Sequence, residues 1–130
     1  MSKKVIVVDD DPDVILFNQT VVEESGFTAL VATNGEEALG IIKKEKPDLV
    51  LLDILMPRQS GIRLYRQLKG DRALKHIPVV VVSGIAKKTF LRSQKALTEF
   101  GGEDVPEPEF YLEKPVEPEE LAATLKKILE

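Results

Sequence analysis

Five polar side chains that could bind a metal ion or a phosphoryl group come directly after a short apolar run, or within two residues of one. They are Asp9, Asp10, Asp53, Ser83 and Lys114. Three carboxylates that lie close together repel one another unless a cation joins them, and hard oxygen ligands suit Mg²⁺. A carboxylate can also attack phosphorus to form an acyl phosphate, whose oxygens need positive charge and hydrogen-bond donors nearby. These residue types indicate Mg²⁺-dependent phosphoryl chemistry, provided that the fold brings them together.

The apolar runs alternate with segments of helical length. The runs cover residues 5–8, 49–52 and 79–82, with weaker runs at 27–32 and 110–112. The first three are continuous, which is typical of strands buried on both faces of a sheet. Helices are expected over 12–25, from 34, over 60–70, over 87–100 and from 118 onward. A strand–helix unit repeated five times predicts an α/β fold with a doubly wound, five-stranded parallel sheet and helices on both faces.

Residues that begin and end helices support these boundaries. Asp11 is expected to cap the first helix, and Asn34 the second, with Glu37 three residues later. Ser60 is expected to cap the third helix by the same chemistry. Gly26 is placed to end the first helix.

The predicted sheet places the polar side chains on one edge, because ligands of open parallel sheets bind beyond the carboxyl ends of the strands. Asp53 stands alone at its strand end and is the best candidate for the nucleophile. Asp9 and Asp10 are adjacent and better placed to hold a metal ion together. The second strand ends in Ala32 and Thr33 without comparable chemistry, as expected for a strand at the margin of the sheet.

Length and composition narrow the class of protein. The 130 residues suffice for one domain, which we expect to span 1–130. The formal charge of −4 argues against nucleic-acid binding by this chain alone, and the absence of cysteine excludes disulfides and thiol catalysis. No apolar run approaches the roughly 18 residues that a membrane-spanning helix needs, so we expect a soluble, cytoplasmic domain.

Residues 101–109 are acidic and proline-rich, and we expect them to form a surface-loop insertion before the fifth strand.

Four motifs in this order resemble the receiver domain of two-component response regulators, the CheY-like family, over essentially the whole chain. They are VVDD at 7–10, LLDILMP at 51–57 with Gly61 following, VVVVSG at 79–84 and YLEKP at 111–115. The resemblance implies a flavodoxin-like strand order 2-1-3-4-5. It also implies a phosphorylation-dependent switch, in which Asp53 accepts a phosphoryl group from a sensor histidine kinase or a histidine phosphotransfer protein. Such a receiver is not an enzyme, apart from catalysing its own phosphorylation and dephosphorylation.

The resemblance also assigns roles around Asp53. Mg²⁺ would be bound directly by Asp10, Asp53 and the backbone carbonyl of Leu55, with Asp9 acting mostly through water. Two departures from the family pattern are a 31-residue interval between Ser83 and Lys114, and a serine at position 60 where many relatives have aspartate.

The remaining implied roles concern the switch. Ser83 and Lys114 would contact the phosphoryl group, and Ser83 would move toward it. Tyr111 would change rotamer in concert. The bond between Lys114 and Pro115 is expected to be cis. Output would follow through an unknown downstream protein, and whether phosphorylation also drives homodimerisation stays open.

Two other functions fit parts of the sequence. In a phosphatase resembling the haloacid-dehalogenase-like enzymes, Asp9 and Asp11 would be nucleophile and acid, with Ser83 and Lys114 in support. That arrangement leaves Asp53 without a role. The other alternative is a receiver-like interaction module that is no longer phosphorylated, which predicts no response to Mg²⁺ and beryllofluoride, a mimic of the phosphoryl group.

Overall fold

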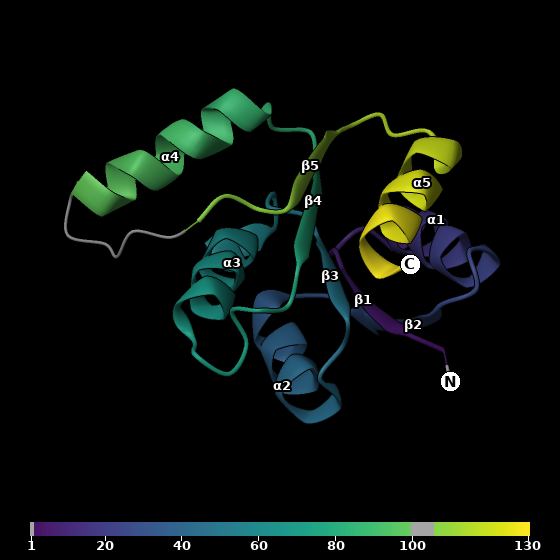
Figure 1. Cartoon of the computed structure of the whole chain (residues 1–130). Coiled ribbons are helices and arrows are strands. Elements are labelled where there is room, and N and C mark those ends of the chain that lie inside the picture. The colour runs from purple at the N-terminus through teal and green to yellow at the C-terminus, as the bar shows by residue number, and fades with distance from the viewer. Residues whose placement is uncertain (1, 100–105) are drawn as a thin grey trace.

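The computed structural model describes residues 2–99 and 106–130, in which strands and helices alternate along the chain (Figure 1). The strands are β1 (Lys4–Val8), β2 (Thr28–Ala32), β3 (Leu49–Leu52), β4 (Val79–Ser83) and β5 (Phe110–Glu113). The helices are α1 (Pro12–Glu24), α2 (Gly35–Glu45), α3 (Ser60–Gly70), α4 (Lys87–Glu99) and α5 (Pro118–Leu129), with a short 3₁₀ turn at Pro57–Gln59. This order confirms the predicted succession of strands and helices.

The strands form one parallel sheet in the order β2-β1-β3-β4-β5, which confirms the predicted topology. Val8 pairs with Ala32 on one side and with Leu52 on the other, so the ends of these strands are level. Ser83 pairs with Glu113 at the end of β4. The loops that follow the strands therefore leave the sheet along one edge.

Helices cover both faces of the sheet, as the continuous apolar runs predict. Figure 1 shows α1 and α5 on one side and α2 and α3 on the other. Ile6 and Val8 of β1 belong to the core beneath α2 and α3, whereas Val5 and Val7 belong to the core beneath α1 and α5. Successive residues of a strand point to opposite faces, so a strand covered on both sides must be apolar throughout.

Most predicted helix boundaries are confirmed. Asp11 accepts a hydrogen bond from the Asp13 N–H at 2.9 Å, and Asn34 accepts one from the Glu37 N–H at 2.8 Å. Gly26 ends α1 with φ +93°, a backbone conformation that side chains with a Cβ atom rarely adopt. The predicted end of α4, at residue 100, lies outside the described part of the chain.

The prediction that Ser60 caps α3 is wrong. The 3₁₀ turn precedes Ser60, which is itself the first residue of the helix. The Ser60 hydroxyl instead accepts a hydrogen bond from the backbone N–H of Gly35 at 3.0 Å. This contact forms because α2 begins close against α3: a Cβ atom at residue 35 would lie 3.2 Å from the carbonyl carbon of Ser60.

The predicted insertion at 101–109 is described only from residue 106 onward. Pro106 and Glu109 both contact α3, through the side chains of Tyr65 and Lys69 respectively. That the segment is an insertion stays a prediction. No helix among the described residues is long and apolar enough to cross a membrane.

Candidate functional site

Three carboxylates gather at the carboxyl edge of the sheet, as predicted. Asp9 follows β1 and is 1% exposed, Asp53 follows β3 and is 6% exposed, and Asp10 is exposed. One oxygen from each lies within 4.8 Å of the others. Because hard oxygen ligands with room for water suit Mg²⁺, this set of donors fits the predicted metal ion.

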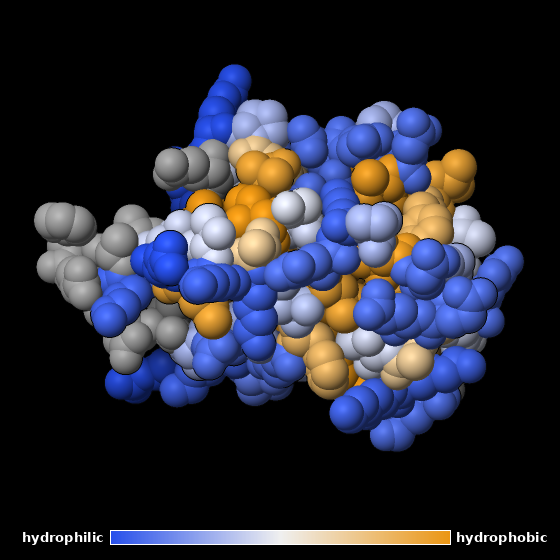
Figure 2. Space-filling model, turned by 90° about the horizontal axis from the view of Figure 1, so that it is seen from above, coloured by the Kyte–Doolittle hydropathy of each residue, from blue (hydrophilic) through white to orange (hydrophobic). Residues whose placement is uncertain are grey.

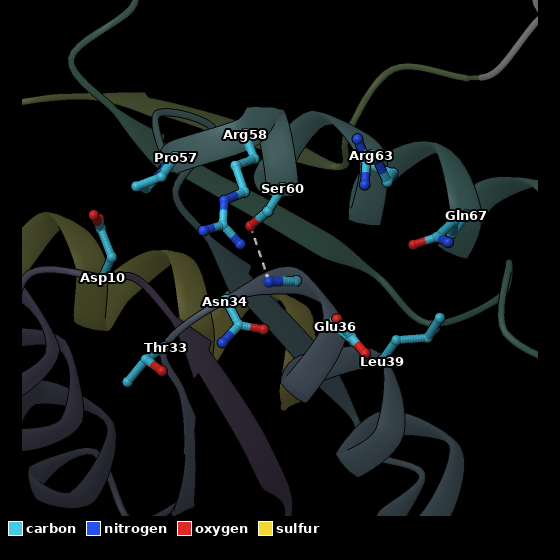
Figure 3. A pocket seen from close by; sticks show the side chains of 11 residues that line it. Asp10, Thr33, Asn34, Glu36, Leu39, Pro57, Arg58, Ser60, Arg63 and Gln67 are labelled. Carbon is cyan, nitrogen blue, oxygen red and sulfur yellow. Dashed lines mark hydrogen bonds between the residues drawn. The ribbon is translucent and has the colours of Figure 1, made fainter.

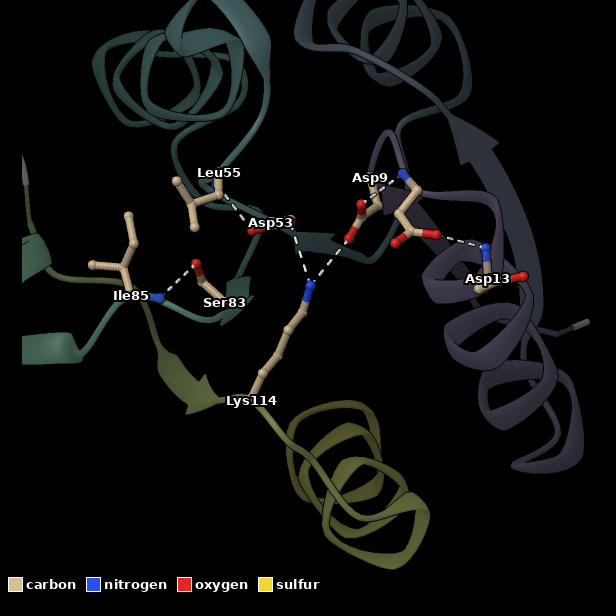
Figure 4. Close-up of polar contacts among 8 residues, drawn as sticks. Asp9, Asp13, Asp53, Leu55, Ser83, Ile85 and Lys114 are labelled. Atoms are coloured by element: carbon tan, nitrogen blue, oxygen red, sulfur yellow. Dashed lines mark hydrogen bonds and ion pairs between the residues drawn. The ribbon is translucent and has the colours of Figure 1, made fainter.

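Lys114 joins two of these carboxylates (Figure 4). Its Nζ atom lies 3.4 Å from Asp53 Oδ2 and 3.7 Å from Asp9 Oδ2. The side chain reaches across from the end of β5, two strands away from β3 in the sheet. The peptide bond between Lys114 and Pro115 is cis, as expected. The ammonium group therefore places positive charge beside the candidate phosphoacceptor.

The backbone holds the other oxygen of each buried carboxylate. The Leu55 N–H donates to Asp53 Oδ1 at 2.9 Å, and the Asp11 N–H donates to Asp9 Oδ1 at 3.0 Å. Each carboxylate is thus oriented by its own loop and presents Oδ2 to Lys114. A carboxylate positioned in this way can attack a phosphorus atom or bind a cation without first reorganising.

The electrostatics of the site centre on Asp9. Burial raises the pKa of Asp9 from its ordinary value of 3.8 to about 6. The hydrogen bond from Asp11 acts in the opposite direction, the negative charge of Asp53 adds to the rise, and Lys114 lowers the pKa again. A nearby cation would stabilise the charged form of this buried carboxylate. The raised pKa of Asp9 therefore agrees with a cation site at this edge of the sheet.

Ser83 ends β4 and is fully buried at the same edge. Its hydroxyl accepts a hydrogen bond from the Ile85 N–H at 3.2 Å and is turned toward Ile85 in Figure 4. Tyr111 donates from its own hydroxyl to the Ile85 carbonyl at 2.6 Å. Burial raises the pKa of the Tyr111 phenol, and the Ser83 hydroxyl acts in the opposite direction. The two predicted switch residues are thus attached to opposite polar groups of Ile85.

A cavity of about 520 Å³ opens beside Asp10, between the start of α2 and the start of α3 (Figure 3). Arg58 and Arg63 line it together with Glu36 and the Ser60–Gly35 contact. Arg58 adopts a left-handed backbone conformation with φ +60°, which is uncommon for a residue with a Cβ atom. Neither arginine was predicted to lie near the site, because no motif marks them and their position depends on how α3 begins.

The chain matches known proteins over nearly its whole length. A family model described as "Response regulator receiver domain" matches residues 5–126. The chain is 35% identical over 129 residues to the alkaline phosphatase synthesis transcriptional regulatory protein PhoP of Bacillus subtilis, covering 99% of this chain but only 49% of that protein. It is 32% identical to the polar-differentiation response regulator DivK of Brucella anthropi, covering 99% of this chain and 98% of that protein. The chain therefore spans about half of the first relative and nearly all of the second.

Solved structures agree with these matches. A putative response regulator from Chloroflexus aurantiacus is 29% identical, with a TM-score of 0.80 over 99% of this chain and 98% of that one. The chemotaxis response regulator CheY4 of Vibrio cholerae superposes with a TM-score of 0.81 at 24% identity, over 99% and 100% of the two chains, which supports the shared fold. The chain belongs to the family of response regulator receiver domains.

Proposed function

We propose that this chain is a phosphorylation-dependent signalling switch that accepts a phosphoryl group on Asp53. The donor would be a phosphohistidine on a sensor histidine kinase or on a histidine phosphotransfer protein. The observation that carries the proposal is the position of Lys114, which lies within 4 Å of both Asp53 and Asp9. We further propose that residues 1–130 act as one receiver domain in the cytoplasm.

The reaction at Asp53 is a simple displacement. A carboxylate oxygen of Asp53 attacks the phosphorus atom, the bond between phosphorus and the histidine nitrogen breaks, and its electron pair returns to the imidazole. Asp53 is oriented for attack by the hydrogen bond from the Leu55 N–H. Lys114 would then stabilise the new negative charge, with Ser83 contributing its hydroxyl.

Mg²⁺ would be held by Asp10, Asp53 and the backbone carbonyl of Leu55, with Asp9 acting through water. When bound, the ion would neutralise charge that develops on the phosphoryl oxygens. The grouping of the three carboxylates supports this assignment.

An apolar hollow beside Lys114 supports a protein as the donor. It has a volume of about 490 Å³ and is lined by Val14 and Phe17 of α1, and by Pro115 and Val116 after β5. Phe17 is 38% exposed. Figure 2 shows apolar side chains at the surface on the side of α1 and α5. A helix that carries the phosphohistidine could place its apolar face here while its imidazole reaches Asp53.

The output of the switch would be a changed affinity for a downstream protein. Phosphorylation of Asp53 adds charge next to Lys114 and biases the positions of Ser83 and Tyr111. Dimerisation of phosphorylated chains is one form that this output could take. The chain itself would slowly hydrolyse the phosphoryl group from Asp53.

Phosphorylation with a small acyl phosphate and Mg²⁺ tests the proposal. We expect a base-labile label that maps to Asp53 and disappears in Asp53→Asn, while the matched Asp71→Asn variant is labelled like the wild type. Absence of the label from the wild type, or a label that persists in Asp53→Asn, contradicts the proposal. Membership of the receiver family argues against the phosphatase alternative, and a structural response to beryllofluoride would exclude a module that is no longer phosphorylated.

A further inference from the structure

Three aromatic side chains form a continuous row between the candidate site and α3. They are Tyr111 of β5, Phe90 of α4 and Tyr65 of α3. The centroid of the Phe90 ring lies 5.5 Å from the centroid of each tyrosine ring, at an interplanar angle of 78° to Tyr65 and 42° to Tyr111. Phe90 is 2% exposed and Tyr65 is fully buried. Because protein interiors are close-packed, a shift of one of these rings alters the space available to the ring beside it.

One end of this aromatic row is attached to the loop that positions Ser83. The Tyr111 hydroxyl donates to the carbonyl of Ile85 at 2.6 Å, and the N–H of Ile85 donates to the Ser83 hydroxyl at 3.2 Å. Tyr111 and Ser83 therefore share one residue of backbone. A movement of Ser83 that displaces the backbone of Ile85 also displaces the acceptor of the Tyr111 hydroxyl.

The other end of the aromatic row is attached to the segment before β5. The Tyr65 hydroxyl donates to the carbonyl of Pro106. One helical turn further along α3, Lys69 Nζ lies 2.7 Å from Glu109 Oε1, and the other oxygen of Glu109 accepts a hydrogen bond from the Val79 N–H at 2.9 Å. The Lys69 side chain is only 2% exposed. The segment 106–109 therefore contacts α3 at two points, through the Tyr65 hydroxyl and the Lys69 ammonium group.

Phe90, a residue of helix α4, lies between these two ends. Figure 1 shows α4 running from the end of β4 away from the sheet. Phe90 reaches from α4 into the space between the two tyrosines, and Gln94 accepts a hydrogen bond from Arg66 of α3 at 2.8 Å. The placement of α4 therefore depends on the same ring that joins Tyr111 to Tyr65.

We infer that Phe90 and Tyr65 are positioning residues that couple the segment 106–109 to Ser83 through Tyr111. Displacement of Tyr111 on phosphorylation moves Phe90, and with it Tyr65 and the segment. By thermodynamic linkage, releasing the segment changes the position of Tyr111 in return. The inference rests on the proposed function, since the signal begins at Asp53. It assigns residues 106–109 a part in regulation.

Fluorine NMR can follow both ends at once, because the chain contains two tyrosines and the aromatic row uses both. The protein would be labelled with 3-fluorotyrosine, and Tyr65→Phe would assign the two resonances. On addition of Mg²⁺ and beryllofluoride we expect both resonances to shift in the wild type. In Phe90→Leu the Tyr111 resonance should shift while that of Tyr65 stays at its ligand-free position. Phe27→Leu, a change of the same kind outside the aromatic row, should behave like the wild type.

A Tyr111 resonance that shifts alone in the wild type would overturn the inference, as would shifts in Phe90→Leu that equal those of the wild type. A second arm needs no phosphoryl mimic. In ligand-free protein, Lys69→Met should shift the Tyr111 resonance, whereas the exposed Lys75→Met should not. If Lys69→Met leaves Tyr111 unmoved, the coupling is disproved. If beryllofluoride shifts neither resonance, the result counts against the proposed function. The Lys69→Met variant would then still test the coupling, because it needs no phosphoryl mimic.

Discussion

Gly61 packs directly against the main chain of Asp53. A Cβ atom at residue 61 would overlap the carbonyl oxygen of Asp53 and lie 2.7 Å from the carbonyl oxygen of Ile54. Real Cβ atoms essentially never approach backbone so closely, so the first turn of α3 can reach the Asp53 loop only with glycine at this position. This contact explains physically why the motif that begins at Asp53 includes a glycine eight residues later.

Replacing this glycine should damage both the fold and the site. We expect Gly61→Ala to lower the free energy of unfolding by about 1–3 kcal/mol, because the methyl group forces α3 and the Asp53 loop apart. The same displacement should slow phosphorylation of Asp53 by a small acyl phosphate. Urea denaturation and single-turnover labelling would measure the two effects.

Gly40 provides the matched control. It lies within α2, and a Cβ atom there would meet nothing within 4 Å. Gly40→Ala should therefore raise the free energy of unfolding by about 0.5–1 kcal/mol through helix propensity, with labelling unchanged. Equal stability of the two alanine variants would show that the close approach at Gly61 is not required.

The raised pKa of Asp9 predicts how stability depends on pH without metal. Between pH 3.8 and about 6, folded Asp9 keeps a proton that the unfolded chain has lost. The unfolded state then binds fewer protons, so the free energy of unfolding falls as pH rises through this window and the loss is complete above it. Asp9→Asn should be more stable than the wild type by about 2 kcal/mol at pH 7.5 in EDTA.

Urea denaturation at pH 4 and pH 7.5 would check this prediction. The free energy of unfolding of Asp9→Asn should exceed that of the wild type by less at pH 4 than at pH 7.5. Added Mg²⁺ should also reduce this difference at pH 7.5, because it stabilises the wild type. Asp13→Asn, which removes an exposed carboxylate, should show no such pattern. A variant at Asp9 that is less stable than the wild type at pH 7.5 in EDTA would contradict the raised pKa.

Replacing Glu109 should lower the free energy of unfolding more than replacing its ion-pair partner Lys69. The ammonium is 2% exposed, whereas the carboxylate is 36% exposed and can be hydrated. Glu109→Ala leaves a buried charge unpaired and should cost about 3–5 kcal/mol of unfolding free energy, while Lys69→Met should cost about 1–2 kcal/mol. Thermal and urea unfolding of both variants would decide, and the reverse order would disprove this account of the pair.

Self-dephosphorylation should be slow. Leu55, which is 58% exposed, and the half-buried Ile85 flank the site and are apolar, so neither can position an attacking water molecule. Leu55→Asn should shorten the lifetime of the acyl phosphate by about tenfold or more, because it adds a polar group that can orient water. Release of phosphate from labelled protein measures the rate, with Leu16→Asn, another exposed leucine, as control. A wild-type lifetime of only seconds would argue against this prediction.

The sequence by itself determined the architecture and the meeting of the acidic residues. Continuous apolar runs such as 79–82 indicate strands buried on both faces, and their alternation with helical segments leads to a parallel sheet between two layers of helices. Once the strands are parallel, Asp9, Asp10, Asp53, Ser83 and Lys114 must emerge at one edge. Caps at Asp11 and Asn34 were also predictable, because they depend on residues two or three positions away.

Only the tertiary structure decided which groups touch. Ser60 bonds to Gly35 rather than capping its own helix, and Lys114 lies between Asp9 and Asp53 while Ser83 bonds to Ile85. The aromatic row and the fastening of residues 106–109 to α3 have no signature in the sequence. The physical reason is that patterning encodes whether a residue is buried, whereas its partners depend on how closely helices far apart in the chain pack against one another.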